Sequence, residues 1–432
     1  MTAPALTLAL QPLGVGSNNI AWRRPHSQAE RLYDLDLFTD LARRAEAAKI
    51  HMLFLSDGLT TDAAQPSGHF EPLTFLTALG ARTREIGLVA TASTTYTEPF
   101  NLARQLASID HLTGGRAGWN IVTSAWGEEN FGRAPLAHPD RYRRAHDFVQ
   151  AATDLWESWD ADAVVVDRER GVLIDPARVR ETGHVSEHFS IRGPLNIARA
   201  PQGRPFLFQA GSSLDGFRLG ARWADAIFAA HPDPDDGARF YEEFKAIVSD
   251  TGRDPDAVKV MPGLYAVIGE SSAHARELAD ELAQLEGRAD FDAQLRTFAR
   301  GGFGGADLSG LDPDRPIPAD RLPDPQTVQG RRSRYELYRR KTQAGHTLRD
   351  LVTDFNAAGS GHWAPVGSAA DIADEIEDRF ARRSADGFVL SSQTFDGYAR
   401  LTDQLVPELQ RRGLFRTSCT GSTLRENVFA PS

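Results

Sequence analysis

Short apolar runs alternate with longer amphipathic stretches along most of this chain of 432 residues. Apolar runs of this length are typical of strands that are covered on both faces. There are eight: Leu6–Leu10, Met52–Leu55, Ile86–Ala90, Ala117–Val122, Phe206–Phe208, Ala226–Phe228, Val258–Val267 and Phe388–Leu390. Helical patterns lie between them, for example at 35–48, at 145–159 and after the capping box of Ser368 and Asp371. The alternation predicts an α/β fold, a (β/α)8 TIM barrel, with a doubly wound open sheet as the alternative.

Two segments interrupt the alternation, and we predict a single domain over residues 1–432 that carries them as insertions. The segment from about 163 to 195 has alternating residues around a turn at Arg170-Gly171, which predicts a β-hairpin. The segment from about 270 to 350 begins and ends with helical patterns and is rich in glycine and proline between them. An insertion between late strands of a barrel falls on one face, so we expect a lid over the C-terminal face.

Composition limits the classes of partner. The net charge of −11, from 48 basic and 59 acidic residues, argues against nucleic acid and anionic membranes as partners. Cys419 is the single cysteine, which excludes a disulfide framework and a thiolate metal cluster. No apolar run approaches the length of a membrane span, and the N-terminus lacks the pattern of a signal peptide. We therefore expect a cytoplasmic protein.

Polar side chains follow three of the predicted strands. Asp57 follows the second, Thr91 begins a cluster of hydroxyl residues after the third, and Asn120 lies near the end of the fourth. At the carboxyl ends of parallel strands, such side chains indicate ligand contacts. The alternatives are a turn aspartate for Asp57 and the β-propensity of threonine for Thr91.

The fifth strand is followed by Gly211-Ser212-Ser213 and then by a helical pattern over 214–222. Backbone N–H groups and hydroxyls at the start of a helix suit a phosphate, although a serine N-cap alone would give the same pattern. His138 and Tyr142 are four residues apart and share a helix face, where they could bind a polar cofactor or move a proton. A solvated helix start is the alternative for this pair.

One short pattern in the sequence weakly resembles a metal site. His184 and His188 fit an H-x-x-E-H zinc pattern, which requires both histidines on one helical face. The surrounding alternation is strand-like, so we predict no metal site and regard a metallohydrolase as an alternative only. The residues by themselves therefore indicate a phosphorylated cofactor at the mouth of a barrel, without naming it.

A set of longer motifs resembles one known family. The motifs are Asp57-Gly58-Leu59, Glu71-Pro72-Leu73, the segments 90–96 and 110–124, Asn130-Phe131-Gly132, Arg141-Tyr142, Leu155–Trp159, Arg192–Asn196, Pro201–Pro205, Gln209–Ser213 and Ala385–Phe388. In this order they resemble the nitrilotriacetate and dibenzothiophene-sulfone monooxygenase group of the bacterial luciferase-like flavin monooxygenases. The resemblance covers nearly the whole chain.

The resemblance implies a TIM barrel that receives reduced FMN from a separate flavin reductase. Dioxygen would form a flavin peroxide, and one oxygen atom would enter a small organic substrate. It also implies a homodimer or homotetramer, and it places both insertions over the site. The flavin contacts of the family fall on these residues: Asp57, Thr91, Asn120, His138, Tyr142, Ser212 and Ser213.

For the catalytic polar groups nearest the reacting oxygen we predict His138, with Asn120, and additionally His362, for which a loop histidine is the alternative. A deazaflavin-dependent oxidoreductase and a non-catalytic flavin-binding relative are the other functional alternatives. The chain departs from the family at Asn18-Asn19, where relatives carry a histidine-containing segment, and in a shortened loop between Leu59 and Glu71. Both regions are expected to line the substrate pocket, so neither family substrate is assumed.

Overall fold

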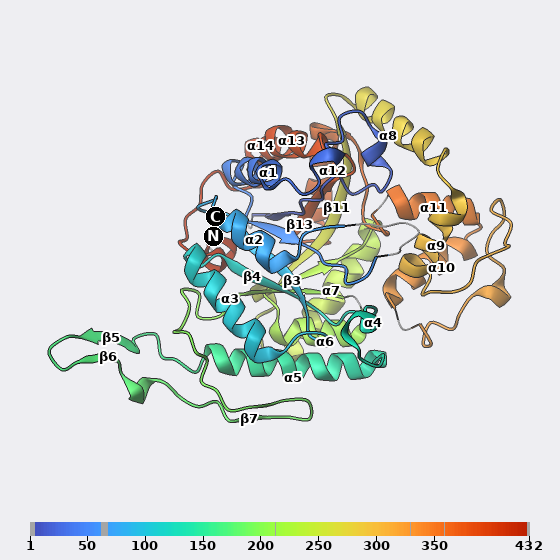
Figure 1. Cartoon of the computed structure of the whole chain (residues 1–432). Coiled ribbons are helices and arrows are strands. Elements are labelled where there is room, and N and C mark those ends of the chain that lie inside the picture. The colour runs from blue at the N-terminus through green and yellow to red at the C-terminus, as the bar shows by residue number, and fades with distance from the viewer. Residues whose placement is uncertain (1–4, 62–67, 212, 329, 358, 430–432) are drawn as a thin grey trace.

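The computed structural model describes residues 5–61, 68–211, 213–328, 330–357 and 359–429. Within these ranges, eight parallel strands close into a ring with the order β10-β9-β4-β3-β2-β1-β13-β11, and β11 pairs again with β10 (Figure 1). The strands are β1 (Thr7–Leu10), β2 (Met52–Leu55), β3 (Gly87–Ser93), β4 (Ala117–Val122), β9 (Phe206–Ala210), β10 (Ala226–Ala229), β11 (Lys259–Gly269) and β13 (Gly387–Ser392). The predicted barrel is confirmed, and the open sheet is excluded.

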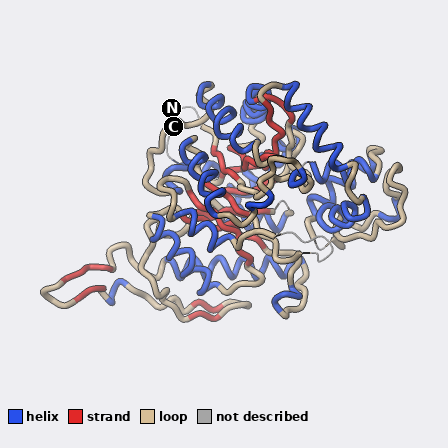
Figure 2. The backbone as a smooth tube through the Cα atoms, turned by 45° about the horizontal axis from the view of Figure 1, so that its top comes forward, coloured by secondary structure: helices blue, strands red, loops and turns tan. Residues whose placement is uncertain are grey.

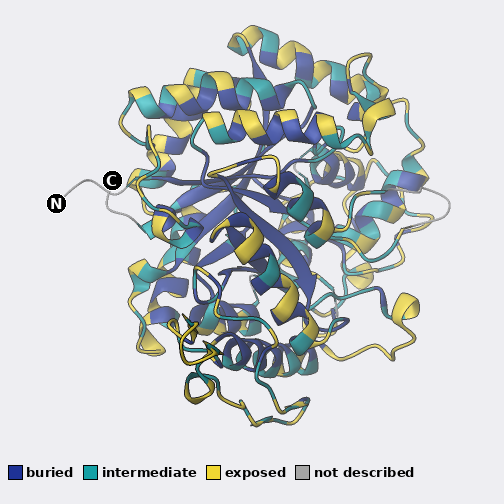
Figure 3. Cartoon of the chain, turned by 60° about the vertical axis from the view of Figure 1, so that its left-hand side comes forward, coloured by how far each residue is buried: buried dark blue, intermediate teal, exposed yellow. Residues whose placement is uncertain are grey.

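The ring is closed by continuous parallel pairing. Thr7 of β1 lies opposite Gly387 of β13, and Ala226 of β10 lies opposite Lys259 of β11. Every residue of β1, β2, β3 and β13 is buried, because side chains pack on both faces of the ring (Figure 3). Burial on both faces explains why these strands are apolar at nearly every position.

Helices surround the ring and connect its strands (Figure 2). Those that cover the barrel are α1 (Leu35–Ala47), α2 (Pro72–Gly80), α3 (Pro99–Thr113), α5 (His138–Trp156), α6 (Leu214–Trp223), α7 (Pro234–Asp250), α12 (Ala369–Ala381), α13 (Gly397–Arg400) and α14 (Val406–Arg411). The capping box of Ser368 and Asp371 begins α12 as predicted. In the part of the chain that the structure describes, none of the helices combines the length and the apolar character needed to cross a bilayer.

Between α5 and β9 the chain forms two short antiparallel pairs in place of one hairpin. The first joins β5 (Val164–Asp167) to β6 (Val172–Ile174) and projects from the molecule; the second joins β7 (His184–Val185) to β8 (Ser190–Ile191) (Figure 1). The second pair packs along the outside of α5, where Phe189 contacts the ring of Phe148. This insertion joins the end of a helix to the beginning of a strand, so it starts and ends away from the carboxyl ends of the strands. The expectation that it covers the site is therefore not met.

The second insertion covers the carboxyl ends of the strands. It contains α8 (Ser272–Glu286), α9 (Phe291–Gly302), α10 (Arg332–Gln343) and α11 (Leu348–Ala357), after which β12 (Val366–Ser368) pairs with β11. Helices α9 to α11 share a hydrophobic cluster of their own. Arg300 of α9 donates to Thr60 after β2 at 2.6 Å, and Gly330 lies against the Trp126 ring beyond β4. The insertion thus reaches two loops of the barrel mouth, those after β2 and β4.

The opposite end of the barrel is closed by the C-terminal helix α15 (Leu424–Phe429), together with a buried ion pair. Leu424 and Val428 pack among the inward-facing side chains of the ring. Arg425 donates to the buried carboxylate of Asp225 at 2.8 Å, and Asp225 also accepts the N–H of Leu207 in β9 at 2.8 Å. This pair ties the last helix to the ring.

Replacing Arg425 by methionine is predicted to lower the free energy of unfolding by about 3 kcal/mol, because Asp225 stays buried with a weaker set of partners. Urea denaturation followed by circular dichroism measures the loss. The control is Arg411→Met, which removes an exposed partner of Glu408 and is expected to cost less than about 1 kcal/mol. Equal effects of the two substitutions would show that the Asp225 pair does not hold α15.

Candidate active site

Two polar side chains predicted from the sequence meet at the ends of β3 and β4. Thr91 lies opposite Asn120 in the parallel register, and the Asn120 Nδ2 donates to the Thr91 hydroxyl at 2.8 Å. Asn120 is 2% exposed, and its Oδ1 has no hydrogen-bond partner among the described residues. A buried amide oxygen without a donor is unfavourable by about 1–3 kcal/mol. The ends of β3 and β4 therefore present an acceptor that suits a ligand N–H group.

Asp57, after β2, is held in place by a histidine. The His69 Nε2 lies 3.0 Å from the Asp57 carboxylate, and this contact raises the pKa of His69. His69 was not identified from the sequence, because a histidine 12 residues away in a loop carries no local signal.

His138 and Tyr142 lie together at the beginning of α5, with their rings 4.9 Å apart. The His138 Nδ1 is 3.3 Å from the Asp215 carboxylate at the start of α6, so the first turns of two helices meet here. Burial lowers the pKa of His138, and Arg332 and Arg141 lower it further. His138 is therefore neutral near pH 7 and is able to accept a proton.

Ser213 caps α6, since its hydroxyl accepts the N–H of Gly216 at 3.2 Å. The Tyr142 hydroxyl lies over the same turn: a Cβ on Gly211 would stand 3.1 Å from it, and a Cβ on Gly216 would stand 3.3 Å from it. Two glycines thus leave space beside a hydroxyl and a helix N-terminus, which is the arrangement that suits a phosphate. Ser212 lies outside the described residues.

His362 lies over the other half of the barrel mouth. Its ring is stacked between Phe228 of β10, at 4.8 Å, and Tyr265 of β11, at 4.6 Å. Its Nε2 faces the Arg334 guanidinium of α10 at 3.0 Å. Because arginine only donates, the His362 Nε2 must accept, so the imidazole is neutral.

The structure therefore divides the predicted residues into two groups. Thr91, Asn120, Asp57, His138, Tyr142 and Ser213 follow or face β2, β3, β4 and β9, which are neighbours in the ring. His362 stands over β10 and β11. Sequence reasoning missed Arg331, Arg334 and Tyr265, because arginines in a polar insertion are usually solvated and a tyrosine within a strand is usually core.

The segment at Asn18, where the chain departs from its relatives, lies on the same half of the barrel rim as His362. The Asn18 side chain is buried and contacts Glu286 of α8 at 3.2 Å and Gln393 at 3.4 Å. Gln393 in turn donates to the Tyr265 carbonyl at 3.2 Å. Burial raises the pKa of Glu286 to about 6.

The histidines of the zinc-like pattern face α5 instead of one another. His184 contacts Asp154 at 2.8 Å, and His188 contacts Asp147 at 2.7 Å. Among the described residues, no group of three or more histidine, cysteine or acidic side chains is placed to hold a metal ion.

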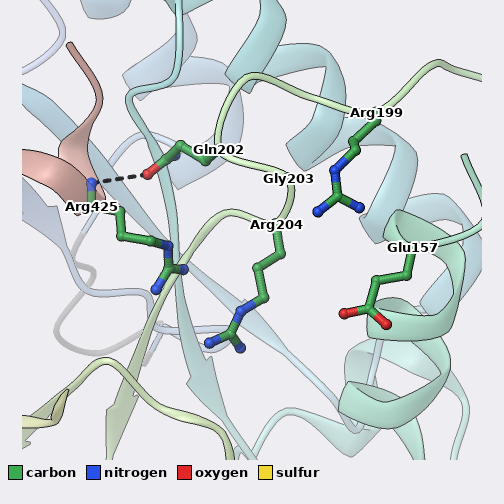
Figure 4. Close-up of a pocket in the computed structure, with 6 residues that line it drawn as sticks. All are labelled: Glu157, Arg199, Gln202, Gly203, Arg204 and Arg425. Carbon is green, nitrogen blue, oxygen red and sulfur yellow. Dashed lines mark hydrogen bonds between the residues drawn. The ribbon is translucent and has the colours of Figure 1, made fainter. Parts of the chain in front are cut away.

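A pocket of about 310 Å³ lies at the other end of the barrel (Figure 4). Its lining includes Arg199, Arg204 and Arg425. Arg204 and Arg425 both contact the buried Asp225, so two of the arginines that line this pocket share a structural carboxylate. The N-terminal face of such a barrel contributes stability, and active sites lie at the C-terminal face.

The stability of the protein is predicted to depend on His362 below about pH 6.5. Burial holds the pKa of His362 well below its usual 6.5, and Arg334 and Arg331 lower it further. The unfolded chain then binds a proton that the folded chain excludes, so this contribution is present above pH 6.5 and is lost as the pH falls. In His362→Gln, which keeps an acceptor for Arg334, the free energy of unfolding should decrease less steeply as the pH falls. The slopes of the variant and the wild type should differ by up to about 1.4 kcal/mol per pH unit. Equal slopes between pH 6.5 and 5 in urea titrations would contradict this assignment.

Comparison with known proteins agrees with this geometry. The chain is 39% identical over 422 residues to N-acetyl-S-(2-succino)cysteine monooxygenase from Bacillus subtilis (strain 168), covering 96% of this chain and 94% of the relative. It is 38% identical over 427 residues to nitrilotriacetate monooxygenase component A from Aminobacter aminovorans, covering 94% and 92%. A solved riboflavin lyase with modified FMN and riboflavin superposes with a TM-score of 0.86 at 28% identity, covering 98% of this chain and 95% of that one.

These relatives confirm the resemblance that the sequence motifs indicated. Both are monooxygenases by name, and both match this chain along nearly its full length. The profile described as luciferase-like monooxygenase matches residues 18–387. The chain is an enzyme and belongs to the luciferase-like family of flavin-dependent monooxygenases.

Proposed function

We propose that this enzyme is the oxygenase component of a two-component system. It takes reduced FMN from a separate flavin reductase and uses dioxygen to add one oxygen atom to a small organic substrate. The relative from Aminobacter aminovorans is named as component A of its monooxygenase, which supports a separate second component. FMN is favoured over a deazaflavin because the solved relative with modified FMN superposes along nearly the whole chain.

The observation that carries the proposal is the grouping of six side chains over adjacent strands. Tyr142 and Ser213 border a glycine-lined space at a helix N-terminus, which fits a phosphate. The unpaired Oδ1 of Asn120 lies farther along the same rim and fits a flavin-ring N–H. A phosphate site and a ring site on one rim suit a flavin mononucleotide better than either feature alone.

Reduced FMN supplies the two electrons with which one oxygen atom of dioxygen enters the substrate and the other leaves as water. The chain binds and orients the flavin through Asp57, Thr91, Asn120, Tyr142 and Ser213. The helices of the 270–350 insertion help to exclude water from the rim, as Arg300 and Gly330 contact the loops after β2 and β4.

Two histidines have different roles in this proposal. His138 has a lowered pKa and lies next to the proposed phosphate end, so it is able to accept a proton near neutral pH. His362 is fixed between two rings and bonded to Arg334, which suits a residue that positions a neighbour.

We also propose that the chain acts as one domain in a homodimer or homotetramer. Large apolar side chains lie exposed on the projecting strands β5 and β6, with Val164 48% and Leu173 62% exposed. An exposed apolar hairpin with free edges favours a protein partner. Light scattering on the purified enzyme reports the number of subunits.

Substitution of Ser213 by aspartate is predicted to weaken FMN binding by at least about tenfold, because the new carboxylate repels the phosphate while still capping the helix. Binding is measured by quenching of flavin fluorescence. Riboflavin, which has no phosphate, should bind Ser213→Asp and the wild-type enzyme equally well.

The matched variant is Ser213→Asn, which caps the helix without adding charge and should bind FMN nearly as the wild type does. If FMN and riboflavin respond equally to Ser213→Asp, the phosphate does not lie at this turn. If wild-type enzyme binds no FMN, the proposed function is wrong.

The second test concerns the flavin ring at Asn120. Reduced FMN bound to wild-type enzyme should reoxidise in air-saturated buffer at least about tenfold more slowly than free reduced FMN, since the site excludes water. Stopped-flow absorbance follows the oxidised flavin. Asn120→Ala should shorten this delay, because the ring loses its partner.

Asn101→Ala, at an exposed position on α3, is the control and should leave the delay unchanged. Reoxidation of the bound flavin at the rate of free flavin would argue for a flavin carrier in place of an oxygenase.

A further inference from the structure

Two arginines at the start of α10 stand out because they have almost no partners. Arg331 is the N-cap residue of α10, and Arg334 lies three residues later, so the two share a face of the helix. The Arg334 guanidinium makes one hydrogen bond, to the neutral His362 Nε2 at 3.0 Å, and its buried Nε has none. Within the described residues, neither arginine has a carboxylate within ion-pair distance.

Other arginines of this chain show how the fold satisfies such a group when its role is structural. Arg116 is 5% exposed and has no ion pair among the residues that the structure describes, yet its nitrogens donate to the carbonyls of Thr113, Ile86, Gly80 and Thr83. Arg425 has Asp225. Compared with these, Arg331 and Arg334 keep most of their donors unused.

The surroundings leave Arg334 with fewer partners than its burial calls for. Desolvation by the surrounding protein lowers the pKa of Arg334 to about 10, and the neighbouring charge of Arg331 lowers it further. Arg331 is exposed, so its charge is hydrated. Both guanidinium groups stay charged at neutral pH, and the buried Nε of Arg334 has no acceptor among the described residues.

Arg334 lies over a different pair of strands from the proposed flavin contacts, while the neighbouring Arg332 is close enough to His138 to lower its pKa. His362, which holds Arg334, is stacked on Phe228 of β10 and Tyr265 of β11. The proposed flavin contacts follow β2, β3, β4 and β9, on the other half of the rim. Tyr265 donates to Gln11 after β1 at 2.7 Å, so buried polar groups underlie the half of the rim with the arginines.

We propose that Arg331 and Arg334 bind a carboxylate of the organic substrate, so that the enzyme acts on carboxylic acids. The inference rests on the proposed function, because it assigns the other half of the rim to the flavin. Guanidinium groups match carboxylates through paired N–H donors, and two of them on one helix face suit a substrate with one or several carboxylates. His362 is then a positioning residue for Arg334.

The test compares binding of nitrilotriacetate, succinate and the uncharged trimethyl ester of nitrilotriacetate by calorimetry, with and without oxidised FMN. At least one acid should bind the wild type more tightly than the ester binds. Arg331→Met and Arg334→Met should each weaken acid binding about tenfold or more, because each removes charge-assisted hydrogen bonds. FMN affinity should stay unchanged in both variants, which also shows that they fold.

Arg340→Met is the matched control: it makes the same change of charge on the same helix, at an exposed residue that pairs with Asp236, and should leave acid binding unchanged. Arg334→Lys keeps the charge without the paired donors and should fall between wild type and Arg334→Met.

The outcomes separate the two proposals. If the ester binds as tightly as every acid, or if both methionine variants bind the acids as the wild type does, the inference is wrong while the flavin site stands. If the methionine variants lose FMN affinity in place of acid affinity, the arginines hold the flavin phosphate, and the inference is overturned. If wild-type enzyme binds no FMN, the proposed function fails, and the titration without FMN still reports whether the arginines bind a carboxylate.

Discussion

Parallel pairing around a closed ring is the constraint on which the rest of this structure depends. The pairs β1–β13 and β10–β11 complete the ring, so the carboxyl ends of all eight strands meet at one rim. Side chains more than 200 residues apart in the sequence, such as Gln11 and Tyr265, are brought within 2.7 Å of one another there. The loops after the strands therefore share one site, whatever their order in the chain.

The two ends of the barrel differ in how their buried polar groups are partnered. At the N-terminal end, Arg204 and Arg425 converge on the buried Asp225, so each guanidinium has a carboxylate partner within the protein. At the rim, Asn120 keeps an unused acceptor, and Arg334 keeps unused donors. Compensated charges stabilise a fold, whereas unused polar groups in a desolvated setting favour a ligand. This difference distinguishes the candidate site from the pocket at the other end.

Local patterns in the sequence predicted most of the fold. The eight apolar runs became the eight strands, and the capping box at Ser368 became the start of α12, because burial on both faces and helix capping are set by neighbouring residues. The segment 163–195 was predicted less well. Its alternating residues indicated strands, but two turns divide them, and the position of the segment between α5 and β9 places it beside α5.

The sequence by itself determined the barrel, the family and the polar residues at strand ends, because each depends on short-range pattern or on motifs that stay together in the chain. Only the tertiary structure decided which of these residues share a half of the rim. It placed His69 against Asp57, and it placed His362 against Arg334, at sequence separations of 12 and 28 residues. It also left Arg334, with its buried Nε, without a counterion among the described residues, a property that no local pattern encodes, since the surroundings of such an arginine depend on every chain segment that packs around it.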